Sequence, residues 1–297
     1  MNKSLRIGIA LVLLVTVWAG ISAAQRDRRD FRDRRDRDRW DDDRRDRDFD
    51  DRRGVPEWEN NEQFKHDVFT FVRVRYNSGG RYGRGWGRRG GGGDWATDYR
   101  DSDLNFSFRL QQLTSLRVNP EPVVVELTDP ELFDYPFIYI IEPGNLFFTE
   151  PEKESLRLYL ENGGFLMVDD FWGDYEWLNF YEQITGALGR EPVELPLEHP
   201  IFHCVYDLKE KPQICSIGHA VRGRAYGVTW EGGPDTRTPH YKGIFDDDGR
   251  LMVIICHNTD LGDGWEEEGV DEWYFHEFAE NKAYPLGINI VVYAMTH

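Results

Sequence analysis

Cysteine is scarce in this sequence, which contains only Cys204, Cys215 and Cys256 among its 297 residues. An odd number of thiols cannot pair completely within one chain, so a framework of several disulfides is excluded. A single Cys204–Cys215 disulfide remains open, as does the alternative that all three thiols stay free. Cys256 follows the apolar run 251–255, and we expect it to be a small buried side chain.

Basic residues are also in deficit, with 36 Lys and Arg against 54 Asp and Glu and a formal net charge of −18. The deficit lies beyond residue 53, because the tract 26–53 holds 13 Arg and 12 Asp and is nearly neutral. A nucleic-acid-binding protein needs a concentrated basic face, and so does a protein that docks on anionic lipid. We therefore expect no nucleic-acid partner and no attachment to an anionic membrane surface.

Only one long apolar run is present, residues 7–21, and it lies between a basic start and the small residues Ser22, Ala23 and Ala24. This order is typical of a secretory signal peptide, here residues 1–24. The run is shorter than the roughly 20 residues that span a bilayer, which disfavours the alternative of an N-terminal membrane anchor. We expect export to the periplasm or the extracellular space, with no stable membrane anchor after cleavage.

Residues 25–60 have a composition that does not favour folding. Arg and Asp dominate this stretch, so burial of apolar surface cannot offset the entropy of ordering the chain. We expect a disordered linker; the alternative is a weak contact with envelope polymers through its few aromatic side chains. A second stretch, 79–93, is rich in Gly and Arg and has no acidic residue, which is typical of a flexible loop insertion.

Residues 61–297 have the hydrophobic pattern of one α/β domain. Short apolar or alternating runs typical of strands are separated by segments of helical spacing. The predicted strands are 67–76, 123–127, 137–141, 165–168, 226–230, 242–246 and 250–257, and the predicted helices are 102–117, the segment from Thr149 to Asn162, 174–188, 272–280 and 286–295. Alternation of strands and helices predicts a mostly parallel sheet between two helical layers, a three-layer sandwich.

Several motifs in the same order resemble the bacterial domain of unknown function 4159 family. They include YNSGG at 76–80, GGFLMVDD at 163–170, LEHPIFH at 197–203 and LGINIVVYAMTH at 286–297. The likeness covers roughly residues 67–297. It implies a flavodoxin-like fold of the class I glutamine amidotransferase type, and no established reaction.

Amidotransferases use a Cys at a strained elbow between a strand and a helix. Here the comparable strand, 165–168, is followed by Asp169 and Asp170, and no Cys or Ser is present. We therefore do not expect thiol-dependent glutamine hydrolysis.

Acidic and polar side chains follow the predicted strands, at the edge where ligands collect in open parallel sheets. Asp169 and Asp170 end one strand, Glu142 and Asn77 follow two others, and Trp172 lies beside the aspartates. Paired carboxylates can hold a hard cation, or one can be protonated while the other stays ionised. We expect these five residues to bind a ligand. The alternative is that Asp170 caps the following helix and Asp169 binds backbone amides.

The segment 259–268 carries further acidic residues around two glycines, including Asp260, Asp263 and Glu266. Flexible oxygen ligands of this kind bind calcium or another divalent metal in extracellular modules, although the spacing here is not that of an EF-hand. The alternative is a solvated acidic turn. No other cofactor is expected.

The leading functional prediction is an exported ligand-binding or scaffold domain without catalytic activity, whose partner is an unknown envelope ligand or protein. The first alternative is an envelope hydrolase in which Asp169 or Asp170 is the base and His257 or His199 the acid. A zinc site of His199, His257 and Asp169 is disfavoured, because no HExxH motif is present. The second alternative is a structural envelope protein that acts through its Arg/Asp tract.

Overall fold

The computed structural model describes residues 52, 54–64, 67–79 and 94–297. They belong to one compact unit that spans Arg52–His297. The predicted signal peptide 1–24, most of the predicted linker and nearly all of the predicted insertion 79–93 lie outside the described residues. None of the helices in these ranges combines the length and the apolar character that crossing a bilayer requires.

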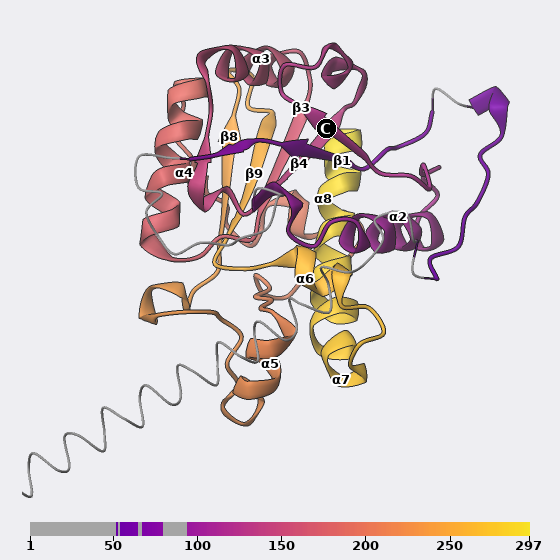
Figure 1. The fold of residues 1–297 in the computed structure, drawn as a ribbon, viewed down its shortest axis with the longest axis vertical. Helices are drawn as coiled ribbons and strands as arrows, with labels where there is room; N and C mark the ends of the chain where they lie inside the picture. The colour runs from indigo at the N-terminus through magenta and orange to yellow at the C-terminus, as the bar shows by residue number, and fades with distance from the viewer. Residues whose placement is uncertain (1–51, 53, 65–66, 80–93) are drawn as a thin grey trace, which may run out of the picture. The chain divides into compact units, whose positions relative to one another are not determined.

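A seven-stranded sheet forms the centre of this unit, with the strand order β3-β1-β4-β6-β9-β8-β7 (Figure 1). The first five strands in this order are parallel, and β8 and β7 continue the sheet in antiparallel pairing. The strands are β1 (Val72–Arg75), β3 (Val123–Glu126), β4 (Phe137–Ile141), β6 (Phe165–Asp169), β7 (Val193–Glu194), β8 (His240–Phe245) and β9 (Leu251–His257). A separate pair joins β2 (Asn77–Ser78) and β5 (Leu146–Phe147). The prediction of a mostly parallel α/β sheet is confirmed.

Helices cover both faces of the sheet. On one face, strand residues such as Tyr139 and Met167 pack against α2 (Asp101–Leu113), α6 (Leu261–Glu266) and α8 (Tyr284–Thr296). On the other face, Val74 and Val168 pack against α3 (Glu150–Glu161) and α4 (Gly173–Leu188). The alternation of side chains along each strand decides which core a residue joins.

The remaining helical elements are short. Two of them, α5 (Ile217–Gly223) and α7 (Glu272–Tyr274), lie with α6 below the sheet in Figure 1, at the end where β9 stops. Short 3-10 turns are η1 (Glu62–Phe64), η2 (Asp94–Ala96), η3 (Pro130–Asp134), η4 (Pro143–Asn145), η5 (Pro200–Phe202), η6 (Arg224–Tyr226) and η7 (Pro234–Thr236), and η8 (Phe275–Ala283) is a π-helix.

Local sequence signals account for two of these boundaries. The Thr149 side chain accepts a hydrogen bond from the Glu152 amide, and the Thr149 amide donates to Glu152 Oε2 at 2.7 Å, which is the capping box expected at the start of α3. Gly249 has a φ of 85° between β8 and β9, and the two strands pair antiparallel as the Asp248-Gly249 turn predicts.

Three predicted segments differ from the structure. The strand predicted over 226–230 is wrong, because Arg224–Tyr226 form a 3-10 turn and Gly227 takes a left-handed φ of 63° that ends it. The helices predicted over 272–280 and 286–295 form one continuous helical run, in which the π-helical stretch occupies the middle.

The compact unit starts earlier than residue 61. Trp58 Nε1 donates a hydrogen bond to the carbonyl of Val118 at 2.7 Å, and Asn60 Nδ2 donates to the same oxygen at 2.8 Å. Arg52 Nη1 donates to the carbonyl of Pro120 at 2.9 Å. Arg52, Trp58 and Asn60, which the composition assigns to the linker, are therefore bound to the segment that leads into β3.

Candidate functional site

Three neighbouring parallel strands each end in a residue with a left-handed backbone. Glu142 follows β4 with a φ of 47°, Asp170 follows β6 with 55°, and Asn258 follows β9 with 60°. Asp98, between η2 and α2, has a φ of 59° and completes the set of such non-glycine residues within the described ranges. Backbone strain of this kind concentrates at functional sites. It marks the carboxyl edge of the sheet as the candidate site.

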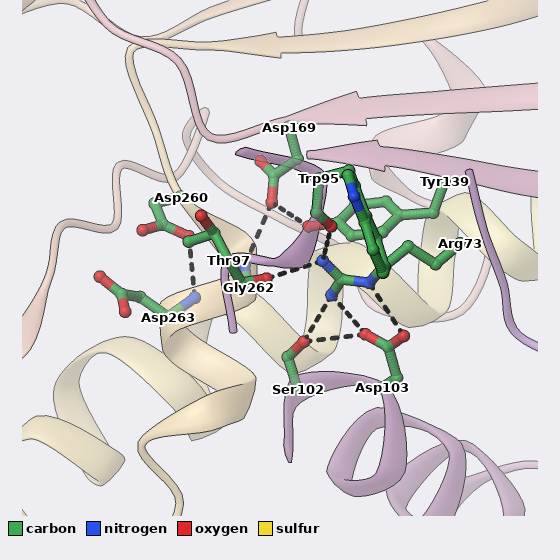
Figure 2. A network of polar contacts seen from close by, with 10 residues as sticks. All are labelled: Arg73, Trp95, Thr97, Ser102, Asp103, Tyr139, Asp169, Asp260, Gly262 and Asp263. Atoms are coloured by element: carbon green, nitrogen blue, oxygen red, sulfur yellow. Dashed lines mark hydrogen bonds and ion pairs between the residues drawn. The ribbon is translucent and has the colours of Figure 1, made fainter. Parts of the chain in front are cut away.

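Asp169 is the last residue of β6, and its side chain is completely buried. Its Oδ2 accepts hydrogen bonds from Gly262 N at 3.1 Å and from the Tyr139 hydroxyl at 3.1 Å (Figure 2). The same oxygen also accepts a hydrogen bond from Leu261 N at 2.8 Å. Its Oδ1 makes no hydrogen bond of normal geometry with a described residue. Burial raises the pKa of Asp169 to about 7, although the Gly262 amide opposes this shift. Asp169 therefore ties β6 to the start of α6.

Asp170 is the next residue, and only 7% of it is exposed. Its Oδ1 accepts a hydrogen bond from the indole Nε1 of Trp172 at 3.0 Å. Burial and the nearby carboxylate of Glu142 raise the pKa of Asp170 well above its usual value. Asp170 does not cap α4 through the first helical amide, since Gly173 N donates to Asn258 Oδ1 at 2.8 Å.

A group of three buried aspartates lies at the same edge: Asp98, Asp260 and Asp263, here called the acidic cluster. Each offers one carboxylate oxygen, and these oxygens all lie within 4.8 Å of one another. Asp260 is the N-cap of α6, and its Oδ1 accepts a hydrogen bond from Asp263 N at 2.8 Å. Burial raises the pKa values of Asp260 and Asp263 well above the usual range; the charge of Asp170 raises the pKa of Asp260 further, and the charge of Asp98 raises that of Asp263.

The donor set of the acidic cluster is typical of a hard cation. It offers carboxylate oxygens and no nitrogen or sulfur ligand, which is the chemistry that Ca²⁺ and Mg²⁺ prefer. Asp170 adds negative charge nearby, because its carboxylate raises the pKa of Asp260. Glu266, predicted as a third ligand with Asp260 and Asp263, instead groups with Asp263 and Glu267.

Gly262 allows α6 to approach the acidic cluster closely. A Cβ atom at this position would lie 2.7 Å from Asp98 Oδ2 and 3.2 Å from the Tyr139 hydroxyl. Both separations are shorter than ordinary contacts of a methyl group, so any larger residue would displace these side chains. Glycine at 262 therefore keeps the carboxylate of Asp98 and the first turn of α6 together.

Two other predicted ligand residues lie at the periphery. The Glu142 carbonyl accepts a hydrogen bond from the Tyr76 hydroxyl at 2.6 Å, and the Glu142 carboxylate acts on Asp170 electrostatically. Asn77 is exposed in β2, and its amide donates to Glu152 Oε1 at 3.4 Å. Asn77 thus contacts Glu152 in the first turn of α3.

His257 ends β9 and is 4% exposed. Its Nε2 lies 3.1 Å from the Gly173 carbonyl, and burial lowers its pKa to about 4. Side chains alternate along a strand, so His257 shares the sheet face of Ile255, whereas Asp169 shares the opposite face with Met167. Asp169 and His257, one of the predicted base and acid combinations, therefore point to opposite sides of the sheet.

His199 lies away from both of them. Its Nδ1 accepts a hydrogen bond from Ile201 N at 3.3 Å, and its ring centre lies 5.5 Å from that of Tyr293, in the last turns of α8. The structure therefore brings His199, His257 and Asp169 together neither as a zinc site nor as the acid and base of the hydrolase alternative.

A serine and a histidine do meet an acid near the carboxyl edge. Ser216 Oγ lies 2.7 Å from His219 Nδ1, and the same nitrogen lies 3.2 Å from Glu231 Oε2. A proton relay needs the serine and the acid on different ring nitrogens, so this group is not a catalytic triad. Glu231 Oε1 accepts the Ser216 amide at 2.6 Å, which ties the start of α5 to the segment before β8.

The sequence did not predict Asp98 or Glu231, although both contribute charge to the candidate site. Asp98 follows no apolar run, and Glu231 follows the segment 226–230, which does not form the predicted strand, so each reaches the site through an irregular segment. Aspartate tolerates a left-handed backbone better than most residues, but the sequence does not indicate which aspartates adopt one. Cys204, Cys215 and Cys256 are all free thiols, so the Cys204–Cys215 pairing is not formed.

These features define the class of the protein: an α/β domain with a mostly parallel sheet and a buried acidic site at the carboxyl edge. The chain belongs to the family described as Domain of unknown function (DUF4159), whose model matches residues 70–295. The resemblance seen in its motifs is thereby confirmed. No curated protein matches the sequence.

Proposed function

We propose that this protein is an exported, non-catalytic binding domain whose ligand at the acidic cluster is a hard divalent cation, Ca²⁺ or Mg²⁺. One observation carries the proposal: Asp98, Asp260 and Asp263 are buried, come from two segments far apart in the sequence, and place carboxylate oxygens within 4.8 Å of one another.

Electrostatics supports a cation as the partner of this cluster. Buried carboxylates at such a distance cannot all ionise, because burial and mutual repulsion both favour the protonated form. A divalent cation would balance their charge and replace the water they lose on burial. Two further features support a polar ligand at this edge. Asp169 Oδ1 is buried without a hydrogen bond to a described residue, and Gly262 lies close to the carboxylate of Asp98.

The strand order supports a relation to flavodoxin-like and amidotransferase-like folds, which we include in the proposal. Numbered along the chain, the five parallel strands follow the order 2-1-3-4-5, which is typical of doubly wound flavodoxin-like sheets. Asp170 occupies a strained turn between β6 and α4 with a φ of 55°. An acid at that elbow, where a nucleophile is needed for acyl transfer, favours binding over thiol catalysis.

Export rests on the sequence alone, through the basic start, the apolar run 7–21 and the small residues before position 25. Extracellular modules bind calcium with dissociation constants of about 10⁻⁴–10⁻³ M, because the surrounding calcium concentration is high. A weak cation site therefore suits the proposed location.

Isothermal titration of the metal-free mature protein with CaCl₂ and with MgCl₂ tests the proposal. We expect saturable binding of at least one of the two ions, and a loss of about tenfold or more in affinity for Asp263→Asn, since one charged ligand is removed. Asp248→Asn is the matched control, because Asp248 is exposed in the β8–β9 turn. Absence of saturable binding of both ions at millimolar concentration would refute the proposed function.

A further inference from the structure

Arg73 is a fully buried arginine in the middle of β1. The guanidinium carries five N–H groups, and the structure gives five hydrogen bonds from it. Two go to the carboxylate of Asp103 and one goes from Nη2 to Ser102 Oγ at 3.0 Å. The other two go from Nη1 to the carbonyls of Trp95 at 3.0 Å and Thr97 at 2.7 Å (Figure 2).

The two carbonyl contacts hold the segment that carries Asp98. Thr97 immediately precedes Asp98, and on the other side the Asp98 carbonyl accepts the Ser102 amide at 3.0 Å. Asp98 is fixed from both directions in a left-handed backbone that most residues avoid. The carboxylate of Asp98 also acts on the Arg73 guanidinium, which places the two side chains near each other.

We propose that Arg73 is a positioning residue for the acidic cluster, which sets the place of Asp98 by binding the carbonyls of Trp95 and Thr97. This inference rests on the proposed function, since it concerns the affinity of the same cation site. Groups behind the direct ligands of a metal orient those ligands, and their loss reduces metal affinity by about 10–100-fold.

The carbonyl contacts are separate from charge balance. Asp103 forms a buried ion pair with Arg73, and both side chains are 0% exposed. The bonds to Trp95 and Thr97 add no charge, and what they fix is the path of the backbone into the acidic cluster. A lysine at position 73 could keep an ion pair with Asp103, but its single nitrogen lacks the planar fork that spans Asp103 and both carbonyls.

Arg250 provides a matched comparison at the opposite end of the sheet, just before β9 begins. It pairs with Asp246 and also donates to two backbone carbonyls, those of Leu160 at 2.6 Å and Gly164 at 3.2 Å. Arg250 therefore has the same kind of contacts, yet it holds no residue of the acidic cluster.

The experiment compares Arg73→Lys and Arg250→Lys in the mature protein by titration with CaCl₂ and MgCl₂, with thermal unfolding in EDTA as the measure of folding. We expect Arg73→Lys to weaken cation binding about tenfold or more, and Arg250→Lys to change it less than twofold, whatever each does to the melting temperature. In an Asp98→Asn background, Arg73→Lys is expected to have no further effect on affinity, because the ligand it positions is already impaired.

Several outcomes decide the inference. If the wild-type protein binds cations and a folded Arg73→Lys variant binds within twofold of it, Arg73 has no positioning role and the proposed function stands. If the wild-type protein binds neither ion, the proposed function and the positioning role of Arg73 are both refuted. Should Arg73→Lys not fold, Thr97→Gly replaces it: added backbone freedom of about 0.5–1 kcal/mol is expected to weaken binding about two- to fivefold. Unchanged affinity in Thr97→Gly would contradict the inference.

Discussion

Adjacent aspartates at the end of β6 have different surroundings. Asp169 accepts three hydrogen bonds on one oxygen and holds the start of α6, whereas Asp170 accepts one from Trp172 and faces other carboxylates. The apolar run 165–168 was enough to place both at a strand end. It could not separate their roles, because these depend on Leu261 and Gly262, which lie far along the chain.

Asp169→Asn is predicted to flatten the pH dependence of stability. The folded pKa of about 7 lies above the ordinary value of 3.8, so the folded protein holds the extra proton between these values. The contribution of Asp169 to the free energy of unfolding is therefore fully present below about pH 4. It is lost as the pH rises from about 4 to 7, by up to about 1.4 kcal/mol per pH unit. Asparagine keeps an acceptor for Leu261 and Gly262 but does not titrate.

Urea unfolding at several pH values between 4.5 and 7.5, in EDTA, measures this difference. The slope of unfolding free energy against pH is expected to be less negative in Asp169→Asn than in the wild-type protein. The exposed control Asp248→Asn should keep the wild-type slope. Identical slopes in all three proteins would mean that Asp169 is ionised throughout this range and that burial does not control it.

Arg73 shows where sequence reasoning at the residue scale ends. It alternates with Val72 and Val74 in β1, which is the pattern of a strand with one solvent-facing side. The structure buries it completely, because α2 supplies Asp103 and the segment before α2 supplies two carbonyls. An alternating strand predicts which residues share a face, but it does not indicate whether a charged face meets water or a partner.

At the scale of elements, helix and strand starts that depend on local chemistry were predictable. The capping box at Thr149 and the turn at Gly249 need only neighbouring residues, and both are present. The segment 226–230 resembled a strand through its apolar residues, yet Gly227 ends a 3-10 turn there. Short segments without a strand partner are decided by tertiary contacts, which a single sequence does not contain.

Gly262→Ala tests whether the first turn of α6 is held against Asp98. The added methyl group would meet Asp98 Oδ2 at 2.7 Å, so we expect a loss of about 1–3 kcal/mol in unfolding free energy and weaker cation binding. The matched control is Gly186→Ala in α4, where nothing lies within 4 Å of the added atom. That variant should gain about 0.5–1 kcal/mol, because alanine favours a helix. Thermal and urea unfolding give both values, and a gain in Gly262→Ala would contradict the close approach.

At the scale of the whole molecule, the order of apolar runs predicted the parallel sheet because the central strands β4, β6 and β9 are buried on both faces. The same reasoning assigns residues 25–60 to the linker, although Arg52, Trp58 and Asn60 are bound to the segment before β3. Residues 52–60 are mostly polar or charged, and their attachment depends on a few side chains such as Trp58 and Asn60. Composition averages over a segment and therefore misses an attachment made by single residues.

Two truncations distinguish a domain that begins at Arg52 from one that begins at residue 61. A chain that begins at Arg52 keeps every contact of the compact unit and is expected to melt within about 1–2 °C of the mature protein. A chain that begins at 61 loses the Trp58 and Asn60 bonds to Val118, the Arg52 bond to Pro120 and the packing of Trp58 on Phe108, whose ring centres are 5.9 Å apart.

Those losses sum to about 2–4 kcal/mol from hydrogen bonds and buried aromatic surface, so the shorter chain should melt about 5–10 °C lower. A Trp58→Ala variant of the longer chain should account for a large share of that shift, because the indole supplies both the bond and the packing. If both truncations melted together with the mature protein, residues 52–60 would add nothing to the fold, and the domain would begin at 61 as its composition indicates.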